Sequence, residues 1–61
     1  MNYFKAINFG TKILKHNNFA PNKLDSELLL AHVLNSTREE MLVNLNKKIK
    51  KQNFKYYKSL I

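Results

Sequence analysis

The sequence predicts an all-α fold, a small helical bundle of four to five helices packed around a central apolar helix at about residues 22–35. In four successive segments, apolar residues recur at spacings of three, four and seven, as they do on one face of a helix. Short polar breaks separate the segments, and there is no repeat, Gly/Ser-rich linker or low-complexity tract. With 61 residues, we expect one domain spanning residues 1–61.

Composition excludes several classes of protein. The chain has no cysteine, which excludes a disulfide framework, a thiol nucleophile and a thiolate metal site, and which suits a reducing cytoplasm. No run approaches the roughly 18 apolar residues of a membrane span. We therefore expect an unprocessed, soluble, cytoplasmic protein with no membrane partner and no metal.

The first helix is predicted from about Asn2 to His16, with an apolar face formed by Tyr3, Phe4, Ile7, Ile13 and Leu14. Gly10 lies inside this helix and costs about 1 kcal/mol relative to Ala. A glycine at this position would allow a second helix to cross closely.

The second helix begins after a polar break and ends near Asn35. Pro21 suits a first helical position, whereas Asn22 with Asp25 suits a cap, and both starts remain open. A short third helix is expected at about Thr37 to Asn44, with Met41, Leu42 and Leu45 pointing inward. Ser36-Thr37-Arg38-Glu39 and the overlapping Thr37 to Glu40 both fit a capping box at its start.

The stretch LDSELLLAHVL, residues 24–34, predicts that the second helix is central. Wound at about 100° per residue, its apolar residues cover most of the circumference and leave a narrow gap that holds Asp25 and His32. A helix of this kind is surrounded by its neighbours. We expect Leu28, Leu30 and Leu34 to be among the most buried residues.

The two histidines are the obvious candidates for catalysis, and both are better explained structurally. His32 has no Ser or Cys at a recognisable spacing, and Asp25, two turns away, is too distant to orient its ring. His16 and His32 each lie in the last turn of a predicted helix, where the helix dipole favours a cation. We assign no catalytic, cofactor-binding or metal-binding residue.

The C-terminal segment, Lys50 to Ile61, is predicted to be an amphipathic helix without a polar N-cap. Its apolar face consists of Phe54, Tyr57, Leu60 and Ile61, and a core role suits these residues better than nucleic-acid or membrane binding. The net charge is +7, yet all four acids lie within residues 25–40. The candidate partner-binding residues are Lys47, Lys48, Lys50 and Lys51. Compositional drift towards lysine explains these residues equally well.

Residues 19–34, FAPNKLDSELLLAHVL, and residues 37–42, TREEML, resemble the N-terminal domain of the HemK-type methyltransferases, which modify a glutamine of peptide chain release factors. That domain typically has a helix, a proline, a Leu-Asp-Ala-Glu-Leu-Leu-Leu-Ala-His-Val-Leu-Gly helix and an Arg-Glu-Glu-Leu-Leu turn. Ser26 stands where the family usually has Ala, and Asn35 where Gly is usual. Asn, like Gly, tolerates a left-handed position at a helix end.

The resemblance implies that this domain precedes a catalytic domain that binds S-adenosylmethionine through a glycine-rich turn and holds the target amide with an Asn-Pro-Pro-Tyr motif. One Gly and one Pro exclude both features from these 61 residues. The resemblance therefore implies a domain that recognises or positions a release factor, with the catalytic domain in cis as its other partner. The alternative is a freestanding basic helical module that binds nucleic acid through residues 47–58.

Overall fold

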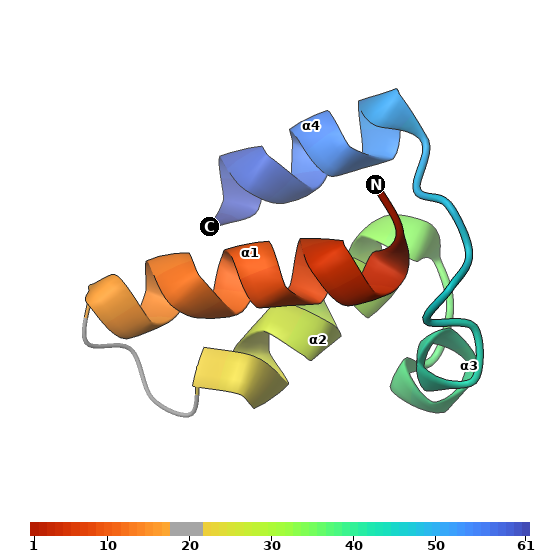
Figure 1. Ribbon diagram of the computed structural model, residues 1–61, viewed down its shortest axis with the longest axis horizontal. Helices are drawn as coiled ribbons and strands as arrows, with labels where there is room; N and C mark the ends of the chain where they lie inside the picture. Colours follow the sequence, from red (N-terminus) through yellow and green to blue (C-terminus); the bar gives the residue numbers. More distant parts are fainter. Residues whose placement is uncertain (18–21) are drawn as a thin grey trace.

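The computed structural model describes residues 1–17 and 22–61, and within these residues it is helical without a strand (Figure 1). The helices are α1 (Tyr3–His16), α2 (Asn22–Leu34), α3 (Arg38–Leu42) and α4 (Lys51–Leu60). α2 contacts each of the other three helices. This confirms the all-α bundle and the central position of α2.

The N-terminus of α1 is capped twice. The Asn2 side chain accepts a hydrogen bond from the Lys5 N–H at 2.8 Å. The N–H groups of Tyr3 and Phe4, which have no partner within the helix, donate to the carbonyls of Lys47 and Leu45, each at 3.0 Å. The segment between α3 and α4 therefore serves as a backbone cap for α1. Residues 43–46 form turns, so the described residues contain four of the four to five helices predicted.

α2 ends in a Schellman motif. Asn35 adopts φ 54°, the Ser36 N–H donates to the Ala31 carbonyl at 3.1 Å, and the Asn35 N–H donates to the His32 carbonyl at 3.2 Å. Asn35 thus takes the left-handed position predicted for it. At the other end Asn22 already lies within the helix and is not its cap; a start at Pro21 falls outside the described residues.

A capping box starts α3, and it uses Thr37 and Glu40 rather than Ser36 and Glu39. The Glu40 N–H donates to the Thr37 hydroxyl, and the Thr37 N–H donates to the Glu40 carboxylate, each at 3.1 Å. The Thr37 N–H and the Thr37 hydroxyl, which donates to the same carboxylate oxygen at 3.0 Å, hold the pKa of Glu40 below its ordinary value. The helix is shorter than predicted because Val43 already forms its C-cap.

The core lies where α1, α2 and α4 meet, and α3 closes it with Met41. Its buried hydrophobic residues are Ala6, Ile7, Leu30, Ala31, Val33, Met41 and Tyr57, with Leu42, Leu45, Phe54 and Ile61 among the partly buried residues packed against them. As expected, Lys50 precedes α4 without a side-chain cap. Leu60 lies outside this core with 40% of its surface exposed, which corrects its assignment to the apolar face.

The predicted close crossing at Gly10 is present. Gly10 is buried beneath the Tyr57 hydroxyl, and a Cβ at this position would overlap that hydroxyl and lie 2.7 Å from Ser26 Oγ. The Ser26 hydroxyl donates to the Ile7 carbonyl at 2.8 Å and lies 2.6 Å from Tyr57 Oη. One contact point therefore joins α1, α2 and α4.

One expectation about α2 is wrong. Leu30 is fully buried and Leu34 is partly buried, but 49% of Leu28 and 39% of Leu24 are exposed. Instead, Ser26 and Glu27 occupy the buried side because each has a polar partner there. The apolar circumference of α2 is therefore only partly covered, and two leucines one turn apart face outward.

Candidate partner-binding site

The centre of the candidate site is an ion pair between α2 and α3. Arg38 Nη2 and Nε donate to the same carboxylate oxygen of Glu27, Oε1, at 2.8 and 3.0 Å. The Glu27 side chain is only 6% exposed, whereas the Arg38 side chain is 37% exposed. A buried carboxylate is tolerated because it is paired and hydrogen-bonded.

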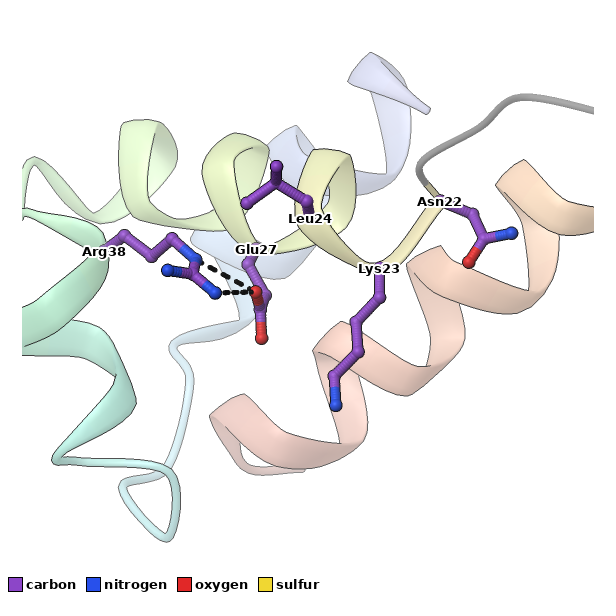
Figure 2. Close-up of a pocket in the computed structure, with 5 residues that line it drawn as sticks. All are labelled: Asn22, Lys23, Leu24, Glu27 and Arg38. Atoms are coloured by element: carbon purple, nitrogen blue, oxygen red, sulfur yellow. Dashed lines mark hydrogen bonds and ion pairs between the residues drawn. The ribbon is translucent and has the colours of Figure 1, made fainter.

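A cleft of about 470 Å³ opens beside this pair, lined by Asn22, Lys23, Leu24, Glu27 and Arg38 (Figure 2). Figure 2 shows Glu27 and Arg38 pointing toward one another, whereas no dashed line joins the Lys23 side chain to the pair. The cleft thus combines two cations, one neutralised carboxylate and the edge of an exposed leucine. Such a surface suits contact with a protein side chain.

Sequence reasoning missed the Glu27–Arg38 pair, although a signal was present. Arg38 is the single arginine among eleven basic residues. The guanidinium fork suits a partly buried carboxylate better than a lysine ammonium does. Glu27 and Arg38 both fall within the segments that carry the family resemblance. These two segments therefore serve in part to join α2 to α3.

The four predicted partner-binding lysines are exposed and adjoin one another along the chain. Lys47 and Lys48 lie in the connector that pairs with the N-terminus, where Asn2 and Lys48 form an isolated β-bridge. Lys50 is the N-cap of α4 and Lys51 is its first residue. None of these side chains forms an ion pair within the described part of the chain. Their role in binding stays a prediction.

The structure does not bring the histidines into a reactive cluster. His16 and His32 are exposed in the last turns of α1 and α2, as predicted. Across residues 1–17 and 22–61, no group of three His, Cys, Asp or Glu side chains is placed to hold a metal ion. No helix among these residues is both long and apolar enough to span a bilayer.

The fold also changes the pKa of Tyr57, in the direction opposite to that of Glu40. Burial raises its pKa above the ordinary value, and the Ser26 hydroxyl, which can donate to a phenolate, works in the opposite direction. The serine hydrogen is already given to the Ile7 carbonyl, so the neutral phenol is the donor in the 2.6 Å bond to Ser26. This arrangement is structural and belongs to the core.

Comparison with known proteins supports the resemblance in the sequence. The family model described as PrmC N-terminal domain matches residues 5–61. Neither the curated proteins nor the solved structures yield a significant match. Because the match includes all of α2, α3 and α4 and most of α1, the chain belongs to the PrmC N-terminal domain family, that of the HemK/PrmC release factor glutamine methyltransferases.

Proposed function

We propose that this domain recognises and positions a peptide chain release factor for a protein-glutamine N5-methyltransferase of the cytoplasm, with the catalytic domain in cis. The observation that carries the proposal is the family match over residues 5–61. Contacts remote from the reacting amide can orient a large protein substrate in a way that a catalytic cleft alone cannot.

The fold supports this proposal in two respects. The Gly10–Ser26–Tyr57 contact and the Glu27–Arg38 pair fix three helices relative to α2, so the domain presents a preorganised surface. The surface also offers apolar and charged contacts together, since the exposed Leu24 lines the cleft beside Lys23 and Arg38. Protein interfaces combine such groups.

We expect the described residues to lack a site for S-adenosylmethionine, the methyl donor expected in the parent enzyme. The only glycine, Gly10, lies inside α1 beneath Tyr57 and forms no open turn at a helix N-terminus. We therefore assign the cofactor to the catalytic domain. Titration calorimetry of the 61-residue chain should detect no saturable binding of S-adenosylmethionine at micromolar concentration.

Deletion of residues 1–61 from the parent enzyme tests the recognition role. Cofactor binding should remain, whereas kcat/KM for an intact release factor should fall sharply because remote contacts are lost. A short glutamine-containing peptide makes few such contacts and should be affected far less. Equal losses for protein and peptide would show instead that the domain only stabilises the catalytic fold.

A further inference from the structure

Two phenylalanine rings, those of Phe9 and Phe54, pack against each other between α1 and α4, and we call this contact the seam. The centroids of Phe9 and Phe54 are 5.4 Å apart, and the ring planes meet at 63°, an edge-to-face arrangement. Both residues are partly buried. The two helices lie beside each other in Figure 1, and this ring pair joins their facing sides.

Lysines bracket each ring on its own helix. Lys5 precedes Phe9 by four residues and Lys12 follows it by three, whereas Lys51 precedes Phe54 by three and Lys58 follows it by four. Residues at these spacings are neighbours on a helix surface. All four lysines are exposed. We call these residues the aromatic–lysine face: Lys5, Phe9, Lys12, Lys51, Phe54 and Lys58.

The charge of this face is uncompensated. The acids of the chain all lie within residues 25–40, so α1 and α4 carry lysines and no carboxylate. The ion pair recorded among the described residues is Glu27–Arg38, which lies between α2 and α3. A surface of one sign steers an oppositely charged partner and raises its association rate.

We propose that the aromatic–lysine face is the docking surface for an acidic surface of a protein partner. The inference rests on the proposed function and deepens it, because it assigns a face that meets the protein substrate in addition to the cleft of α2 and α3. Carboxylates on the partner pair with the four lysines around the seam. An apolar partner side chain lies against the partly buried rings between them.

The geometry of the rings favours a protein over a nucleic acid. Single-stranded nucleic acids bind on open aromatic faces, on which bases stack. Here the rings pack against each other edge to face, and Lys58 Nζ lies 5.4 Å from the centroid of Phe54. The single arginine, the residue type that most often reads guanine, is bound to Glu27. The face therefore offers point charges without a stacking platform.

Two variants with equal net charge test the position of the surface. The first replaces the four lysines of the face with Gln (K5Q, K12Q, K51Q and K58Q). The second variant, which serves as the charge control, replaces four other exposed lysines (K15Q, K47Q, K48Q and K50Q). Three of these are partner-binding candidates from the sequence, so the two variants decide between the aromatic–lysine face and those earlier candidates. Binding to poly-L-glutamate, to a release factor and to single-stranded and duplex DNA is measured at low and at physiological salt.

We expect the face variant to bind poly-L-glutamate and the release factor about tenfold or more weakly at low salt, and the control variant to change much less. Equal weakening in both variants would overturn the inference, because net charge alone would then explain binding. Tighter binding to DNA than to poly-L-glutamate, lost in the face variant, would identify a nucleic acid as the ligand and also overturn it.

One further readout locates the surface without a variant, and two combinations of binding results separate the inference from the proposed function. Amide chemical shifts of the wild-type chain, titrated with poly-L-glutamate, should change in α1 and α4 rather than in α2; this readout needs no variant to fold. If poly-L-glutamate binding depends on the face but no release factor binds, the proposed function fails while the surface assignment stands. If the release factor binds both variants as tightly as the wild type, the proposed function stands and the inference fails.

Discussion

The hydroxyl oxygen of Tyr57 lies 2.6 Å from the hydroxyl oxygen of Ser26, and the space that both occupy is the space that a side chain on Gly10 would need. Three residues that are far apart in the sequence thus depend on one another. Ser26 is also a position at which this chain departs from the usual Ala of the family pattern. The serine is explained here by its hydrogen bonds to Tyr57 and Ile7.

Gly10→Ala should destabilise the domain although alanine is the better helix former. The gain in helix propensity is about 1 kcal/mol, but the new methyl group overlaps the buried Tyr57 side chain, and overpacking typically costs about 1–3 kcal/mol. Chemical denaturation measures the net loss. Asn8→Ala, at an exposed position of α1, is the matched control and should not destabilise. A more stable G10A variant would contradict the close crossing.

Tyr57 should make stability sensitive to alkaline pH. Its folded-state pKa is raised by burial, so the folded state holds the phenol proton more tightly than the unfolded state does. The resulting stability is complete below the unfolded pKa of about 10 and declines as pH rises toward the folded value. Unfolding free energy measured from pH 8 to 11 should therefore fall more steeply for the wild type than for Tyr57→Phe. Tyr56→Phe, at a side chain that is 52% exposed, should leave the wild-type slope unchanged.

Truncation of two leucines on α2 should reduce stability by different amounts, because one lies on the buried side of the helix and the other on the exposed side. Leu30→Ala removes a fully buried side chain and should cost about 2–5 kcal/mol. Leu28→Ala removes one that is 49% exposed and should cost less than about 1 kcal/mol. Urea denaturation of both variants gives the comparison. Similar losses would mean that Leu28 is covered in solution.

The Glu27–Arg38 pair should contribute measurably to the docking of α3 on α2. Arg38→Met leaves a buried carboxylate without its charge-assisted hydrogen bonds and should cost about 1–3 kcal/mol. The cost should shrink in the Glu27→Gln background, where no charge remains to be compensated, and a double-mutant cycle measures the difference. Lys23→Met changes the other cation of the cleft and serves as the control. Additive effects would show that the pair does not couple the helices.

Asn35 should be replaceable by glycine but not by alanine. Its φ of 54° is costly for residues with a Cβ that lack a local polar side chain, so Asn35→Ala should lose about 1 kcal/mol and Asn35→Gly should lose nothing. Thermal unfolding monitored by circular dichroism compares them. Asn46→Ala is a suitable control because Asn46 is exposed and, among the non-glycine residues described, only Asn35 has a positive φ.

Local signals in the sequence were sufficient for the four helices and for several of their ends, because caps and apolar spacing act within a few residues. Asn35 and the Thr37–Glu40 box show this directly. α3 nonetheless ends earlier than predicted. The burial of Ser26 and Glu27 was not predictable in the same way, since each depends on a partner 31 or 11 residues away. Helical projection assigned the leucines of α2 to the core without accounting for these polar pairs, and therefore placed Leu28 wrongly.

The features of the candidate site also differ in whether the sequence alone could predict them. Exposure of Lys47, Lys48, Lys50 and Lys51 followed from their charge. The cleft beside Arg38 and the seam between Phe9 and Phe54 arise only when separate helices are packed together. Spacing within α1 or α4 places lysines around each ring, but nothing in the sequence alone places the two rings in contact.

The backbone bonds between the first residues and the connector bear on how the chain opens. The Ile49 N–H donates to the Met1 carbonyl, and the N–H groups of Tyr3 and Phe4 donate to the Lys47 and Leu45 carbonyls, all at 3.0 Å. Chain ends usually fray, and their amide protons then exchange rapidly with solvent. Here the first turn of α1 cannot fray without releasing residues 45–49 as well. Hydrogen exchange at Tyr3, Phe4 and Ile49 should therefore be slow and share one opening free energy, which makes these amides reporters of cooperative unfolding.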